Sequence, residues 1–177
     1  MFNCRICTDS PLLSAIFGTP AKRPTRAAAA SAAPRKLRDP DNFKPRDVEE
    51  TKTTVVAWEK FVHPRAREFF PSGELLMSVL TQLARGVTVG EDPVLAGENG
   101  CVHWYGEVTK DEVAQAAIRM VKPGEAAESV TFVNRVLVFI FATDESFEQL
   151  MKLPKEPFRM TCGDQLCVNL HHISTSI

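Results

Sequence analysis

The stretch RMTCGDQLCVNLHHIS, residues 159–174, constrains the fold most, because it crowds two cysteines and two histidines into one polar segment. Cys162 and Cys167 are separated by four residues, and four more separate Cys167 from His172. Loops of this length let three side chains converge without regular secondary structure, and the Gly-Asp pair between the cysteines is typical of a tight turn. Zinc takes four tetrahedral sulfur or nitrogen ligands. A fourth ligand must therefore come from elsewhere in the chain.

Cys101 is the obvious candidate for this fourth ligand, with 60 residues between it and the first loop cysteine. The chain has five cysteines. An odd number with short spacings favours metal ligation or reduced thiols over a secreted disulfide framework. Packed or reactive thiols without a metal remain the alternative. Cys4 and Cys7 form a lone C-x2-C pair, which we interpret as free thiols or an interface contact.

The segments around these residues resemble the zinc-bound His-Me finger nucleases, which include the HNH endonucleases and the zinc-loop homing endonucleases. The resemblance rests on C-x-x-W-x-G, starting at Cys101, and on M-x-C-x4-C-V-N-x-x-H-I, starting at Met160. It covers about residues 100–174 and implies a small zinc-stapled ββα domain with one structural zinc ion. The ligands that it implies are Cys101, Cys162, Cys167 and His172.

Two elements of the nuclease chemistry that this resemblance implies are missing. Met160 stands where these enzymes place the histidine that deprotonates the attacking water, and a thioether cannot take that proton. Loss of such a base lowers a rate by about 10²–10⁴-fold. The second element is a catalytic-metal ligand on a helix after the zinc loop, for which the five residues that follow His172 leave no room. Leu170 also replaces the usual Pro, which affects only the turn. We therefore expect no catalytic residue.

His103 and His171 are the nearby side chains that could replace the missing base. A half-exposed histidine on a strand is more often a packing or surface residue, so we favour a scaffold over an active enzyme. An active, divergent HNH-type DNA endonuclease stays open as an alternative. A protein–protein adaptor without nucleic-acid contact is the other.

Residues 1–45 are predicted to form a basic extension rich in Ala and Pro. Between Thr19 and Arg46, eight Lys or Arg residues against two Asp give a local net charge of +6, whereas the whole chain carries −1. Such a segment has little to bury, which predicts either a solvated linker or an arm that orders on a partner. The candidate contact residues for nucleic acid or a protein neighbour are Lys22, Arg23, Arg26, Arg35, Lys36 and Arg38.

Residues 46–99 are predicted to contain two helices. The first spans 46–63 and is ended by Pro64, with its apolar side chains near one face: Val48, Val55, Trp58 and Val62. The second spans 73–85 and is stronger, because its leucines and valine form a broad stripe. Ser72 suits its N-cap and Gly86 its C-cap.

The third predicted segment, 100–177, is the zinc domain, so that the whole chain is expected to be α+β. Its predicted elements are a strand over 101–108, an undecided segment over 114–123, a strand continuing as a buried helix over 128–144, and a short helix over 145–153.

These patterns predict a non-catalytic zinc-binding protein that acts as a structural or partner-binding subunit. A folded body with a long basic arm is typical of a component of a large ribonucleoprotein or organellar assembly. The start of the chain is rich in Arg and Ala and poor in acids, which resembles an organellar transit peptide and predicts an intracellular location. The longest apolar run, VLVFIFA at 136–142, is too short to span a membrane, and we expect no small-molecule substrate.

Overall fold

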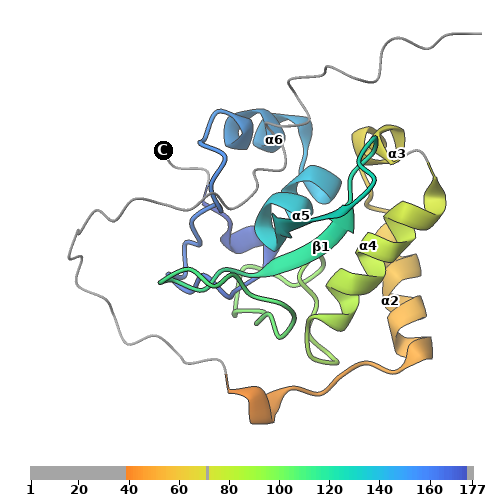
Figure 1. Ribbon diagram of the computed structural model, residues 1–177. Coiled ribbons are helices and arrows are strands. Elements are labelled where there is room, and N and C mark those ends of the chain that lie inside the picture. Colours follow the sequence, from red (N-terminus) through yellow and green to blue (C-terminus); the bar gives the residue numbers. More distant parts are fainter. Residues whose placement is uncertain (1–38, 71, 175–177) are drawn as a thin grey trace, which may run out of the picture.

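The structure is a computed structural model that describes residues 39–70 and 72–174. This part of the chain has an α+β fold with five α-helices and a two-stranded antiparallel sheet (Figure 1). The predicted arm residues from Lys22 to Arg38, together with Cys4 and Cys7, lie outside the described residues. None of the described helices has the length and apolar character needed to span a bilayer. The elements in chain order are η1 (Pro40–Asn42), α2 (Val48–Glu59), α3 (Pro64–Phe69), α4 (Gly73–Arg85), β1 (Ala117–Val121), β2 (Glu128–Phe132), α5 (Val133–Phe141), α6 (Asp144–Met151) and η2 (Leu170–His172).

The first predicted helix forms as α2, but it is shorter than expected. Asp47 and Glu50 make a capping box at its start, each side chain accepting a hydrogen bond from the other residue's backbone N–H. Pro64 does not merely follow the helix, because it opens a separate short helix, α3, at a position where a missing N–H costs nothing. Val48 was expected on the buried face and instead is 59% exposed. It is the first helical residue, directly after the N-cap Asp47, where the helix begins.

The second predicted helix has the bounds expected from its sequence. Ser72 accepts a hydrogen bond from the backbone N–H of Leu75, and the stripe along α4 is buried. Gly86 follows the helix as expected, but with an ordinary right-handed backbone. Its lack of a side chain matters for space, because the ring of Trp104 lies where a Cβ would be, both here and at Gly106.

The undecided segment 114–123 contains a strand, β1, which pairs with β2 in register from Ala117↔Phe132 to Val121↔Glu128. The strand β2 continues directly into the buried helix α5, as predicted. The prediction of a regular strand over 101–108 was wrong. His103 bridges to Cys167 and Val108 bridges to Ala116, so this segment changes partner midway and forms no continuous ladder.

Two apolar cores lie side by side in the fold. In the larger one, α4 packs against α2, α3 and β1, around buried residues such as Trp58 and Leu80. It draws residues from both predicted segments, 46–99 and 100–177, and the division between these segments stays a prediction about the sequence. The smaller core lies where α5 and α6 meet the C-terminal loop, and its buried members are Val138, Ala142, Leu150, Phe158, Met160, Cys167 and Ile173.

Arg135 joins the C-terminal loop to α5. Its side chain is buried, donates hydrogen bonds to the carbonyls of Pro154 (3.0 Å) and Glu156 (2.9 Å), and lies 4.4 Å from the centre of the Phe158 ring. Burial lowers the pKa of its guanidinium to about 10, which still leaves it charged near neutrality. The arginine in the middle of an apolar helix is therefore an anchor for the chain that leads to the cysteine–histidine loop.

Candidate metal centre

Two short antiparallel contacts bring distant cysteines together. The first joins residues 102–104 to 166–168, through hydrogen bonds from Trp104 N to Leu166 O and from Val168 N to Val102 O, each 2.8 Å. This pairing is the reason that Cys101 and Cys167 meet, although 65 residues lie between them. The segment that failed to form a regular strand thus serves as a support for one side of the loop.

The second contact folds the C-terminal loop back on itself. Thr161 N donates to His172 O at 2.7 Å, and Ser174 N donates to Arg159 O at 2.8 Å. Between them, Gly163 adopts a φ of +77°, a backbone that favours glycine, and its N–H donates to Met160 O. The turn predicted from the Gly-Asp pair is confirmed.

Cys101, Cys162, Cys167 and His172, which we call the Cys3His cluster, converge with their ligand atoms all within 4.8 Å of one another. The Nδ1 atom of His172 lies 3.4 Å from Cys167 Sγ and 3.9 Å from Cys101 Sγ. A tetrahedral zinc with bonds of about 2.0 to 2.3 Å separates its donors by roughly 3.5 to 3.8 Å. Across residues 39–70 and 72–174, no other three His, Cys, Asp or Glu side chains converge in this way. The donor set and its spacing fit one tetrahedral metal ion.

Burial disfavours ionisation of the cysteine thiols in the cluster when no cation is bound. Burial raises the pKa of Cys167, which is buried, and that of Cys101, which is half-buried; the neighbouring Cys162 adds to both increases. A divalent cation among these sulfurs would reverse that effect, because a coordinating thiol is deprotonated outright. The arrangement therefore stabilises thiolates only together with a cation.

The ring of His172 is oriented for ligation by a backbone carbonyl. Its Nε2 lies 2.9 Å from the carbonyl oxygen of Glu98. A carbonyl can only accept, so the proton of the neutral imidazole is on Nε2, and the lone pair of Nδ1 faces the three sulfurs. Metal-binding histidines in proteins usually have such a partner, which holds the ring and raises its basicity. Nothing in the sequence indicated Glu98, because its side chain is not involved.

Two further side chains hold the loop in place. Asn169, fully buried, donates through Nδ2 to the carbonyls of Gly97 and Gly100, each at 3.0 Å, and so ties η2 to the segment before Cys101. Asp164 accepts from the backbone N–H of Leu166 (2.9 Å) and lies 3.3 Å from Nε2 of His103. Asn169 was part of the motif that carried the resemblance, but its supporting role follows only from the structure.

The remaining residues of the predicted site lie away from the donors. Met160, at the position of the expected base, is 4% exposed and packs in the smaller core, where it bridges to Ile173. His171 is exposed and is not part of the cluster, in agreement with its prediction as a bystander. His103 is directed to Asp164, and their side chains are each 22% exposed.

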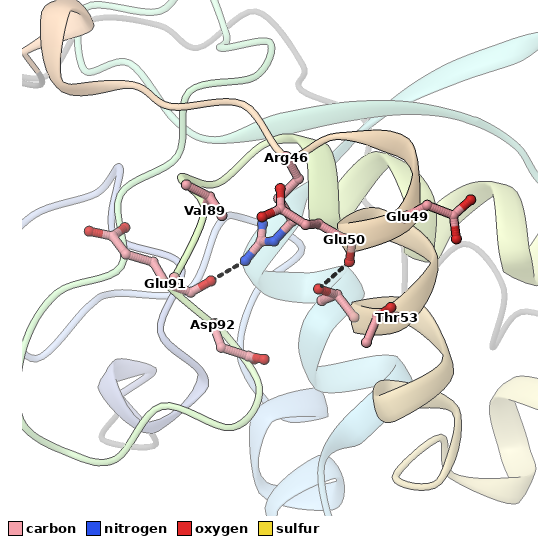
Figure 2. A pocket seen from close by; sticks show the side chains of 9 residues that line it. Arg46, Glu49, Glu50, Thr53, Val89, Glu91 and Asp92 are labelled. Atoms are coloured by element: carbon pink, nitrogen blue, oxygen red, sulfur yellow. Dashed lines mark hydrogen bonds between the residues drawn. The ribbon is translucent and has the colours of Figure 1, made fainter.

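Apart from the Cys3His cluster, the structure has a concave surface, which the sequence did not indicate, between α2 and the loop after α4. It is an open groove of about 420 Å³, lined by Arg46, Glu49, Glu50, Thr53, Thr54, Val89, Gly90, Glu91 and Asp92 (Figure 2). Arg46 donates to three backbone carbonyls, those of Ala84, Val87 and Glu91. The carboxylate of Asp92 accepts from Nε1 of Trp58. These charged groups join the start of α2 to the loop.

Comparison with known proteins leaves the geometry as the only guide to function. No protein-family profile, curated protein sequence or solved structure matches the chain.

Proposed function

We propose that the protein is a non-catalytic zinc-binding subunit, in which one zinc ion staples a domain derived from an HNH-type His-Me finger. The observation that carries the proposal is the convergence of Cys101, Cys162, Cys167 and His172 within 4.8 Å. In such a domain the metal supplies a cross-link between three chain segments.

The surroundings of Met160 support the absence of catalysis. A general base must contact water or substrate, whereas this side chain is only 4% exposed and belongs to the smaller core with Phe158, Leu150 and Ile173. The position that would activate water in a nuclease is used here for apolar packing. The remaining histidine near the loop, His103, is held by Asp164. That pair is the only observation in favour of an active enzyme.

Metal analysis of the purified full-length chain tests the zinc site. We expect about one zinc per chain, lost in His172→Ala and retained in His171→Ala, a matched control that removes the adjacent exposed ring. A Cys4→Ser, Cys7→Ser double variant should keep the metal. A folded wild-type protein without bound metal, or equal zinc content in both histidine variants, contradicts the proposal.

The role of the basic arm is proposed from its charge, and its six candidate residues are Lys22, Arg23, Arg26, Arg35, Lys36 and Arg38. If the arm binds nucleic acid, the logarithm of the affinity falls steeply with the logarithm of salt concentration, by nearly one unit for each phosphate contacted. Replacing the six residues with Ser should flatten that slope. Unchanged mobility of both DNA and RNA at low salt would instead favour a protein–protein adaptor.

A nicking assay on supercoiled plasmid with several divalent metals separates the scaffold from an active enzyme. We expect no cleavage. Metal-dependent nicking that disappears in His103→Ala would establish the divergent endonuclease instead.

A further inference from the structure

The three cysteines of the Cys3His cluster differ in their access to solvent. Cys162 is exposed and Cys101 is half-buried, whereas Cys167 is only 1% exposed. Cys162 also lies in the turn of the loop, directly before Gly163 with its left-handed backbone. Oxidation of cysteines depends on solvent access, and buried structural cysteines are inert. An oxidant that diffuses in from solvent therefore reaches Cys162 first.

Cys101 is the thiol best placed to react with an oxidised Cys162. Its thiol interacts with those of both other cysteines, and the ligand atoms of the cluster all lie within 4.8 Å of one another. The two sulfurs of a disulfide are about 2.0 Å apart, so a movement of at most about 3 Å would join a pair. The sulfur of Cys167 is covered and lies 3.4 Å from Nδ1 of His172. The pair nearest to solvent is therefore Cys101 with Cys162.

We propose that the cluster is also a site of reversible oxidation, in which hydrogen peroxide converts Cys101 and Cys162 to a disulfide and the zinc ion is released. This inference rests on the proposed function, since a bound zinc ion supplies the thiolates by keeping the cysteines deprotonated.

The reaction takes two steps on the sulfurs of the chain. The thiolate of Cys162 attacks one oxygen of the peroxide, the O–O bond breaks, and a sulfenic acid and one hydroxide form. The thiolate of Cys101 then attacks the sulfenic sulfur, so that the S–S bond forms and a second hydroxide leaves. The sulfurs lose two electrons, which the peroxide takes up, and the hydroxides take protons from solvent. Disulfide exchange with an added dithiol reverses the oxidation.

The disulfide joins the same two segments that the zinc ion joins. After oxidation only Cys167 and His172 of the cluster remain as ligands, too few for the four that a structural zinc ion takes. The new bond instead links Cys101 directly to the loop, across the 60 residues that separate the two cysteines. The loop thus keeps one covalent connection to the segment beside it when the metal leaves.

Titration of the zinc-loaded full-length chain with hydrogen peroxide tests the proposal. We expect one zinc ion to be lost for each disulfide formed, and both changes to be reversed by a dithiol and added zinc. The Cys4→Ser, Cys7→Ser double variant is the matched control, because it removes the two cysteines outside the cluster and should lose zinc over the same range of peroxide. Zinc that is retained while no cluster cysteine reacts overturns the proposal, as does irreversible oxidation of Cys162 to a sulfinic acid.

Peptide mapping of the oxidised chain identifies the linked pair. Once free thiols are blocked, a protease that cleaves before aspartate separates Cys162 from Cys167 at Asp164. Mass spectrometry should then find Cys101 joined to Cys162, with Cys167 blocked as a free thiol. A disulfide that contains Cys167 overturns the assignment.

Hydrogen exchange gives a second measurement that needs no substitution in the cluster. Over residues 158–174, the oxidised chain should keep more protection than the reduced chain in a strong chelator. Equal loss of protection would show that the disulfide does not replace the metal. A reduced chain that binds no zinc before peroxide is added would contradict the proposed function itself. The two failures are told apart, because zinc is measured before oxidation and the disulfide after it.

Discussion

The helical region around α4 and the loop around the Cys3His cluster are stabilised by different means. The larger core gathers buried side chains from four helices and strand β1, whereas the smaller one has seven buried members and adjoins a loop whose only regular element is η2. The helical region gains its stability from burial of apolar surface. The loop adjoins the smaller core, and its four converging side chains form the candidate metal site that we propose stabilises it in place of a larger core. With a metal bound at the Cys3His cluster, the chain would combine a region that folds through packing with one that a metal cross-links.

Removal of the metal should produce the largest and most localised effect. A structural zinc ion contributes on the order of 10 kcal/mol to the folding of a small site. In Cys167→Ser, or in the presence of a strong chelator, hydrogen exchange should show loss of protection over residues 158–174. Protection in α4 should persist. If α4 loses protection to the same extent, the two regions form one cooperative unit and the comparison fails.

Leu80→Ala tests the other region. Leu80 is fully buried in α4, and removing its side chain leaves a cavity that should cost about 2–5 kcal/mol in the free energy of unfolding. Chemical denaturation measures this cost, and the zinc content of the folded protein should not change. Leu95→Ala, at a 48% exposed position, is the control and should lie within about 0.5 kcal/mol of wild type. Zinc loss in folded Leu80→Ala would show that the cluster depends directly on this core.

Gly86→Ala tests the junction between the two regions. The new methyl group would overlap the ring of Trp104. Trp104 belongs to the segment 102–104, which pairs with residues 166–168 of the loop. Overpacking of this kind costs about 1–3 kcal/mol, and thermal unfolding should register the loss. Gly73→Ala is the matched control, because no atom lies within 4 Å of its added Cβ. Equal stability of the two variants would mean that the Trp104 ring moves freely.

Asp164→Ala should have the smallest effect and should act on zinc affinity. Removing a residue that supports the ligands typically weakens metal binding by about 10- to 100-fold. Because Asp164 holds the turn and His103 but no ligand ring, we expect a value near tenfold, measured by competition with a chromophoric chelator. Asp111→Ala, an exposed carboxylate in another loop, should bind zinc as wild type does. No difference between the two variants would remove Asp164 from the support of the cluster.

The sequence predicted best the features that depend on neighbours along the chain. The helix over 73–85 was predicted with its bounds, since its stripe, its serine cap and its terminal glycine are all local signals. The turn at Gly163 and the short spacing of Cys162, Cys167 and His172 are local in the same sense. The succession of strand β2 and helix α5 was also predicted, because the composition changes from a β-favouring ESVTF to a mostly apolar VNRVLVFIF.

Features that depend on distant partners were missed. The segment 101–108 alternates like a strand, but its hydrogen bonds go to two different segments, neither of which its own residues specify. Val48 matched the apolar periodicity of its helix and is still exposed, whereas Val55, seven residues later on the same side, is buried, because how far the core extends along a helix depends on its tertiary neighbours. The carbonyl of Glu98 had no signal at all, since any residue offers the same backbone oxygen.

What the sequence determined by itself is the chemistry of the protein: the cysteines and the histidine suited to a soft tetrahedral cation, the methionine at the position of the expected base, and the amphipathic stripe of α4. Their spacing and their side-chain atoms are properties of the covalent chain. Only the tertiary structure decided that Cys101 meets the loop, that Met160 is enclosed in a core, and that Val48 is left exposed. The physical reason is that convergence and exposure depend on how separate segments pack, which no single stretch of sequence specifies.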